Sequence, residues 1–231
     1  MPKDFYQALR ITGTLHIIAL SGTNITIIIN VLGSIFIVFG RRLALVLTIF
    51  FIVLFVFFVG PSASVVRASL MGVISLIGIF FGRQTYSLLI FFVSAVLMLV
   101  FWPAWLFDIG FQLSCLATLG IILFTGHGGL SGRGLVRTLR ADLKTTLAAQ
   151  VFTLPILFFN FHQISFISPV TNLLVGWVVQ PITILGLVIA LCGWIFLPLG
   201  QILAWVAYPF LEYFILVVDL TSKVPGASIT F

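Results

Sequence analysis

Residues 43–59 read LALVLTIFFIVLFVFFV, and this stretch decides the class of fold. Apart from Thr48, every side chain in it is Ala, Leu, Ile, Val or Phe. A transmembrane helix needs about 20 mainly apolar residues to cross the hydrocarbon core of a bilayer. We therefore predict a helix over 43–59 that faces lipid or packs entirely against other helices.

The rest of the chain extends the same pattern. Apolar residues make up 61% of the sequence and charged residues 7%, against about a quarter charged in a soluble domain. So few charges cannot cover a soluble surface, and residues 14–218 are almost a continuous series of apolar stretches. We predict an all-α, polytopic transmembrane bundle of about eight spans, some of them broken or re-entrant. The predicted division is a short polar segment over 1–13, a transmembrane domain over 14–221 and a C-terminal tail over 222–231.

Prolines interrupt the apolar chain after residue 160, at Pro169, Pro181, Pro198 and Pro209. Proline removes one helix hydrogen bond and clashes with the preceding turn. We therefore expect a short or re-entrant segment near 166–180, followed by spans over 182–197 and 202–218.

Basic residues fall in alternate predicted loops. Residues 41–42 follow the first span, Arg83 follows the third, and the segment 133–144 follows the fifth. Lys and Arg accumulate in the short cytoplasmic loops of membrane proteins. The alternation predicts that these loops are cytoplasmic and that the turns at Pro61 and Trp102 lie outside.

The largest basic patch of the chain is formed by Arg133, Arg137, Arg140 and Lys144. Their spacing of four, three and four residues places them on one face of a helix. One interpretation is a surface helix at the cytoplasmic leaflet that binds anionic lipid and sets the topology. The other is a cytoplasmic mouth that follows the phosphates of a polyanion. The sequence leaves both open.

Arg67 stands near the start of the predicted span over 63–81. A guanidinium in that position must be paired, hydrated or able to reach the interface. Asp108, at the head of the fifth span, is its candidate partner, because the predicted topology puts both residues at the outer ends of spans. The alternative is that Arg67 extends to the interface while Asp108 caps its own helix.

Asp108, Gln112 and Cys115 share one face if the fifth span is a regular helix, because offsets of four and seven residues return to nearly the same angle. Lipid cannot satisfy the amide of Gln112, so this face indicates a protein interior or a hydrated path. Simple hydrogen bonding between helices is the alternative. Cys115 and Cys192 lack metal-type spacing, and we expect both to be small core residues.

The first span, over 14–39, begins with the most polar cluster in any predicted helix, formed by His16, Ser21, Gly22 and Asn24. A glycine after a serine in a β-branched run predicts a locally irregular helix whose backbone can face water or substrate. Residues 19–22, Ala-Leu-Ser-Gly, also resemble the serine motif of rhomboid-type intramembrane proteases, with His16 or His162 as the base. A metalloprotease is less favoured, because no His-Glu-x-x-His occurs.

Four motifs follow one another along the chain: His16-Ile-Ile-Ala-Leu-Ser-Gly-Thr-Asn24, Ser64-Val-Val-Arg-Ala-Ser-Leu-Met71, Asp108-Ile-Gly-Phe-Gln-Leu-Ser114 with Ala117-Thr118, and Gln150 with Pro155 leading to Asn172. As an ordered set covering almost the whole chain, they resemble the ComEC-type competence proteins, which carry incoming single-stranded DNA across the bacterial cytoplasmic membrane. Asn24 stands where many members have a second histidine, so we expect no role specific to that histidine.

The resemblance implies a membrane channel for single-stranded DNA import during natural transformation, with multiple spans in the bacterial cytoplasmic (inner) membrane. The DNA path or polar channel that it implies contains His16, Ser21, Gly22, Asn24, Arg67, Asp108, Gln112, Ser114 and Asn172. The cytoplasmic basic surface would contain Arg133, Arg137, Arg140 and Lys144.

The expected partners are single-stranded DNA, anionic lipid and other DNA-uptake components. Typical family members also carry an OB-type domain and a metallo-β-lactamase-like nuclease domain, which we expect as separate partners rather than within these residues. We accordingly expect no enzymatic activity, no metal and no cofactor. The alternatives are an intramembrane serine-type hydrolase acting through Ser21 and a small-anion secondary transporter with a helix broken around Pro169 and Pro181.

Overall fold

The computed structural model of the chain describes residues 3–18, 22–125, 135–161, 163–165, 167–224 and 228–230. Internal contacts divide the chain into two units. We call Leu20–Phe161 the central unit, and Met1–Ala19 together with His162–Phe231 the terminal unit. The predicted division at residues 13 and 221 stays a prediction.

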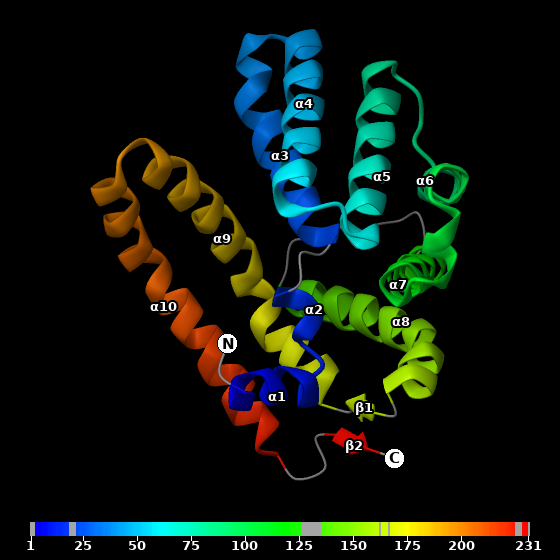
Figure 1. Ribbon diagram of the computed structural model, residues 1–231, viewed down its shortest axis with the longest axis vertical. Helices are drawn as coiled ribbons and strands as arrows, with labels where there is room; N and C mark the ends of the chain where they lie inside the picture. The colour runs from blue at the N-terminus through cyan, green and yellow to red at the C-terminus, as the bar shows by residue number, and fades with distance from the viewer. Residues whose placement is uncertain are drawn as a thin grey trace. The chain divides into compact units, whose positions relative to one another are not determined.

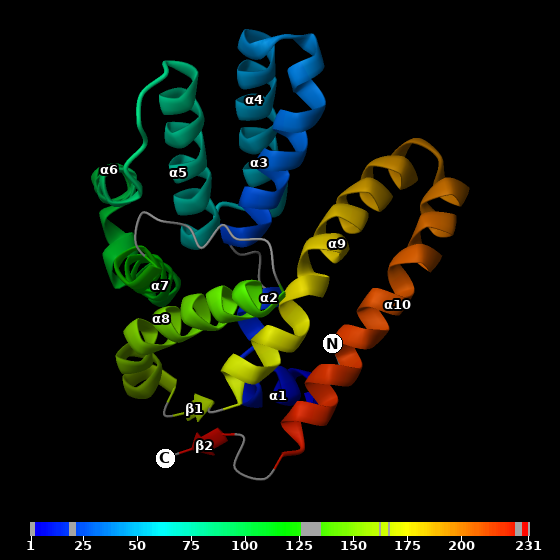
Figure 2. The same cartoon turned by 180° about the vertical axis from the view of Figure 1, so that it is seen from behind.

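Every regular element described in the central unit is a helix. Its elements are α3 (Gly22–Phe36), η1 (Ile37–Phe39), α4 (Arg41–Val59), α5 (Ala63–Phe80), α6 (Ser87–Phe101), η2 (Pro103–Phe107), α7 (Ile109–Thr125) and α8 (Leu135–Phe161). Helices α3, α4 and α5 pack against one another, and α7 packs along α8 (Figure 1). The first three lie side by side in the reverse view as well (Figure 2).

Helix α4 confirms the helix predicted over 43–59 and begins slightly earlier, at Arg41. Its 19 residues extend about 28 Å at 1.5 Å per residue, close to the roughly 30 Å of the hydrocarbon core. Phe57 and Phe58 are 82% and 76% exposed, a surface suited to lipid. Gly60 ends the helix with a φ of 95°, a conformation that glycine adopts without steric strain.

The ends of α4 and α5 bear on the predicted topology. The Nη2 of Arg41, at the start of α4, donates a hydrogen bond of 2.7 Å to the carbonyl of Ile79, near the end of α5. The Arg41 guanidinium also lies 5.8 Å from the centre of the Phe80 ring. The loop before α4 and the loop that carries Arg83 are therefore at the same end of this helix pair, as the alternation of basic residues predicts.

Among the described residues, five helical segments are long and apolar enough to cross a membrane: Gly22–Phe39, Arg41–Val59, Ala63–Phe80, Ser168–Ile195 and Leu197–Ser222. In the most apolar stretch of each segment, at most 22% is buried inside the protein, so most of the surface of these helices is available to lipid. Helices α6 and α7 are shorter and apolar. The predicted all-α membrane fold is confirmed.

The terminal unit consists of α1 (Lys3–Ile11), α2 (Leu15–Ile18), β1 (Gln163–Ser165), α9 (Ser168–Ile195), α10 (Leu197–Ser222) and β2 (Ser228–Thr230). Helices α9 and α10 form a long hairpin, and α1 packs against α10 (Figure 1). Ala8 and Leu9 are buried against Val175, Phe214 and Val218. The short strands pair antiparallel, with Ile164 opposite Ile229, and are a small addition to the predicted all-α fold.

The hairpin corrects the segments predicted after residue 160. Helix α9 is continuous through Pro181, where a break between 166–180 and 182–197 was predicted. The separation predicted between 182–197 and 202–218 is present, at Phe196, and α10 continues through Pro209 as the last predicted span does. A proline inside a helix loses one backbone hydrogen bond, which a transmembrane helix tolerates when neighbouring groups compensate. Pro169 lies in the first turn of α9, where its missing N–H has no helical partner to lose.

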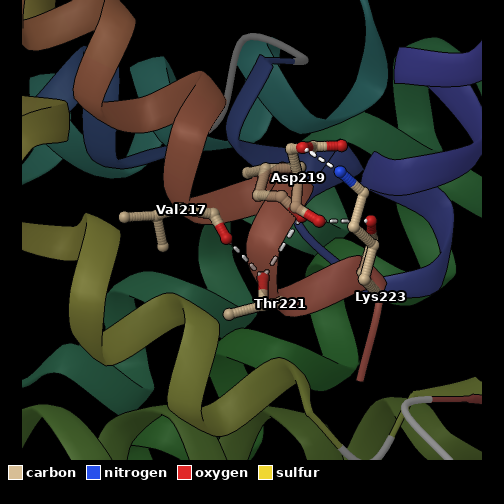
Figure 3. A network of polar contacts seen from close by, with 6 residues as sticks. Val217, Asp219, Thr221 and Lys223 are labelled. Atoms are coloured by element: carbon tan, nitrogen blue, oxygen red, sulfur yellow. Dashed lines mark hydrogen bonds and ion pairs between the residues drawn. The ribbon is translucent and has the colours of Figure 1, made fainter. Parts of the chain in front are cut away.

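Polar side chains gather at the C-terminal end of α10 (Figure 3). The Thr221 hydroxyl donates to the carbonyl of Val217 at 2.7 Å, and the Lys223 ammonium pairs with the Asp219 carboxylate at 2.6 Å. Val218, just before this turn, is fully buried. Helix α10 continues to Ser222, four residues beyond the predicted end of the last span at 218.

Candidate functional site

Arg67 on α5 is the most deeply buried charged side chain among the described residues of the central unit, with 5% of its surface exposed. Its Nη1 donates a hydrogen bond to the Thr118 hydroxyl on α7. Its Nε is shielded from solvent and has no hydrogen-bond partner among the described residues. Removing a cation from water is unfavourable unless its donors are satisfied, so this guanidinium is held at a free-energy cost.

The surroundings of Arg67 are apolar on one side. Ala63, Met98 and Phe111 form a buried cluster, and Cys115 packs against it. Cys115 lies one turn before Thr118, the hydrogen-bond partner of Arg67, on α7. The Cys115 end of the face predicted to be interior therefore adjoins the residue that Arg67 contacts.

Asp108 is not the partner of Arg67, and the predicted ion pair between them is wrong. No ion pair within 4.0 Å joins these two residues, and Asp108 is exposed. Its Oδ1 instead accepts a hydrogen bond of 2.7 Å from the backbone N–H of Phe111. The alternative interpretation, in which Asp108 caps its own helix, is the one that the geometry supports.

Gln112 and Ser114 are both half-buried on α7. The Gln112 Nε2 donates to the carbonyl of Leu106 at 2.9 Å, which ties the preceding turn η2 to α7. The Gln112 amide is therefore hydrogen-bonded locally, between η2 and α7. This geometry is closer to the alternative of simple hydrogen bonding than to a hydrated path.

The start of α3 lies against α5 beside Arg67. A Cβ added to Gly22 would lie 3.4 Å from the Cβ of Ala68, the residue next to Arg67, and Ile29 packs onto Gly72 two turns further along α3. Asn24 is buried, with 7% of its surface exposed. The structure thus brings Gly22, Asn24 and Arg67 into one part of the central unit.

The remaining predicted positions are divided between the units or lie outside the described residues. Ser21 and Arg133 lie outside them, as does His162, the alternative base. His16 lies in α2 and Arg137 in α8, and their side chains are not described. Arg140 and Lys144 are exposed on α8.

Helix α8 also corrects the prediction of a separate surface helix. It runs without a break from Leu135 to Phe161, so the residues of the basic patch from 137 onward belong to the same helix as the predicted span over 145–159. The last glycine before this stretch is Gly134, and nothing between it and Pro155 breaks a helix.

Asn172 belongs to a second polar cluster, in the terminal unit. Its Nδ2 donates to the Ser168 hydroxyl at 3.2 Å, and its Oδ1 is buried without a partner among the described residues. Gly13 has a φ of 68°, and a Cβ there would lie 2.9 Å from Ser168. Thr12 and Thr14 on either side are fully buried and share a hydrogen bond of 2.8 Å.

Sequence reasoning missed Thr12 and Thr14 as site residues, and it quoted Thr118 only as part of the motif that includes Ala117-Thr118. Thr118 could have been found by extending the predicted face of α7, since it stands three residues after Cys115. The two buried threonines flank a glycine, a turn signal inside an otherwise apolar segment. Among the described residues, no group of three or more His, Cys, Asp or Glu side chains is placed to hold a metal ion.

These helices and this buried cation define a polytopic α-helical membrane protein with charged and polar groups held inside its helix packing. The whole chain, residues 1–231, matches the competence protein family, and the chain belongs to that family. It is 36% identical over 172 residues to ComE operon protein 3 of Bacillus subtilis (strain 168). That match covers 73% of this chain and 21% of the relative's length. No solved structure matches the chain.

Proposed function

We propose that this chain forms a membrane channel for single-stranded DNA, acting in DNA uptake during natural transformation. The observation that carries the proposal is the buried guanidinium of Arg67, held on Thr118 in a helix bundle of a competence family protein. A buried cation in a membrane domain needs a reason, because it destabilises the fold relative to an apolar side chain of similar size. The reason that we propose is that Arg67 compensates the negative charge of the DNA phosphates.

The chemistry of Arg67 suits a phosphate. A guanidinium presents five N–H donors in a planar fork that matches two phosphate oxygens. One donor, Nε, has no partner among the described residues, so an anion that reached it would gain a charge-assisted hydrogen bond. In a site of low dielectric constant such an interaction is stronger than in water, which would help offset the desolvation of the DNA backbone.

The alternatives have less support. The transporter hypothesis requires a helix broken around Pro169 and Pro181, and α9 is continuous through Pro181. The hydrolase hypothesis rests on Ser21, which lies outside the described residues. The family match favours neither of them.

In this proposal the chain works in the bacterial cytoplasmic membrane as a channel rather than an enzyme. Its partners are single-stranded DNA and other DNA-uptake components, among them OB-type and metallo-β-lactamase-like domains that handle the DNA on either side.

Uptake of labelled DNA by cells that carry Arg67→Ala tests the proposal. We expect uptake to fall at least about tenfold, the ratio that corresponds to about 1.4 kcal/mol, while the protein still inserts into the membrane. Uptake by Arg67→Lys cells should lie between that of wild-type and Arg67→Ala cells, because lysine keeps the positive charge but lacks the planar fork of donors. Arg83→Ala is the matched control, since Arg83 is exposed and should leave uptake unchanged. Normal uptake in Arg67→Ala cells would contradict the proposal.

A further inference from the structure

A groove lies between α7 and α8, apart from the Arg67 site. It has a volume of about 290 Å³ and is lined by Phe124 on α7 and by Lys144, Leu147, Ala148 and Val151 on α8. Small-molecule sites in proteins occupy roughly 300–1,000 Å³, so this groove admits a segment of a single chain rather than a whole lipid. Four of its five lining residues are apolar, and the fifth is a cation.

The groove exists because α7 and α8 approach closely beside it. A Cβ on Gly120 would lie 2.6 Å from the carbonyl oxygen of Ala148, so the two backbones meet there. One turn further along α7, Phe124 meets the Phe152 ring edge to face, with 5.8 Å between ring centres. This packing fixes one wall of the groove at Phe124 and Ala148, and it leaves Leu147 and Val151 exposed.

The cation is not neutralised by the part of the chain that the structure describes. Lys144 is exposed and forms no hydrogen bond or ion pair with any described residue. Arg140, one turn earlier, adds a second positive charge on the same side of α8. Asp142 is offset by two residues from Lys144 and so points away from it on the helix.

Charge and lining together indicate the ligand. From Lys144 to Val151 the helix rises about 10 Å, so a phosphate held at Lys144 would place an attached hydrocarbon chain along Leu147 and Val151. These two residues are 44% and 58% exposed, which leaves apolar surface for such a chain. We propose that this groove binds one acyl chain of an anionic phospholipid whose phosphate pairs with Lys144.

A lipid fits these residues better than DNA does. A nucleic acid backbone would bring its phosphates along the apolar wall, where only Lys144 offers a partner. A phospholipid presents one phosphate at the end of an apolar chain, which is the order of groups along the groove. The site does not depend on DNA passage, so the proposal stands or fails independently of the channel.

Native mass spectrometry of the full chain in a neutral detergent, with phosphatidylglycerol or phosphatidylcholine added, tests the proposal. We expect wild-type protein to retain phosphatidylglycerol preferentially, and Lys144→Ala to lower that retention about fivefold, which corresponds to about 1 kcal/mol. Arg83→Ala removes an exposed charge outside the groove and should change nothing. Val151→Trp fills the groove while keeping Lys144, and it should lower retention as well.

Several outcomes would overturn the proposal. Equal retention of the two lipids by wild-type protein is one, and equal effects of Lys144→Ala and Arg83→Ala are another. If Lys144→Ala instead weakened binding of a single-stranded oligonucleotide and left lipid retention intact, the charge would serve DNA. Circular dichroism checks that each variant is helical, and Lys144→Gln replaces any Lys144→Ala protein that fails to fold.

Discussion

The hydrogen bond between Arg67 and Thr118 joins α5 to α7, and its contribution to the free energy of unfolding can be measured. Thr118→Val keeps the shape of the side chain and removes the acceptor. Hydrogen bonds between neutral side chains in membrane proteins average about 0.6 kcal/mol and reach about 1.7 kcal/mol. Bonds to charged groups contribute about 1.5–3 kcal/mol. Because only 5% of the Arg67 surface is exposed, no water can replace the Thr118 hydroxyl as the acceptor.

We therefore expect Thr118→Val to lower the free energy of unfolding by about 1.5–3 kcal/mol. Arg67→Met should behave differently, because replacing a buried cation with an apolar residue of similar length is often neutral or stabilising, by about 1–4 kcal/mol. In the Arg67→Met background the Thr118→Val change should then have little effect. The coupling energy of this double-mutant cycle is the quantity to measure.

Reversible unfolding by steric trapping in bicelles gives the four free energies of unfolding that the cycle requires. Thr153→Val is the matched control, because the Thr153 hydroxyl donates only within α8, to the carbonyl of Ala149 at 2.9 Å and to that of Gln150 at 3.2 Å. It should change stability by less than about 0.5 kcal/mol. A coupling energy between Arg67 and Thr118 within about 0.3 kcal/mol of zero would refute the reasoning, since independent sites add to within that margin.

Three further changes test the packing with the same unfolding measurement. Gly120→Ala should destabilise by about 1–3 kcal/mol, because its Cβ would lie 2.6 Å from the Ala148 carbonyl; an unchanged stability would show that α7 and α8 are further apart than described. Gly200→Ala should destabilise to a similar extent, with a Cβ 2.7 Å from the Cα of Gly193, and its failure to do so would count against the α9–α10 hairpin. Asp108→Ala should lose about 0.5–2 kcal/mol of helix capping, and Asp108→Ser should restore most of it; equal losses would argue against the cap.

Much of the fold follows from the sequence because a bilayer imposes simple rules. The run over 43–59 could only be an apolar helix, and α4 occupies it. The alternation of basic loops predicted that the start of α4 and the end of α5 lie together, which the Arg41 contact with Ile79 bears out. Arg67 was identified because a guanidinium in an apolar span must be paired, hydrated or able to reach the interface.

What the sequence could not supply is the pairing between helices. The partner of Arg67 depends on how α5 and α7 pack, and charge alone favoured Asp108 over the neutral Thr118. The continuity of α9 through Pro181 was missed for a related reason, since local sequence does not reveal what compensates a lost backbone bond. Thr12 and Thr14 are likewise buried in the structure, beside a glycine that lies against Ser168, a residue distant in sequence.

If single-stranded DNA passes close to Arg67, as we propose, a cysteine of the chain can serve as a probe of its path. Of its two cysteines, Cys115 lies one turn before Thr118, the hydrogen-bond partner of Arg67, and Cys192 lies in α9 of the terminal unit. The direct measurement is to let competent cells take up DNA that carries thiol-reactive groups on its phosphates, and to map the cross-linked residue by mass spectrometry. We predict a cross-link at Cys115 that disappears in Cys115→Ala. Active uptake with no cross-link at Cys115 would contradict it.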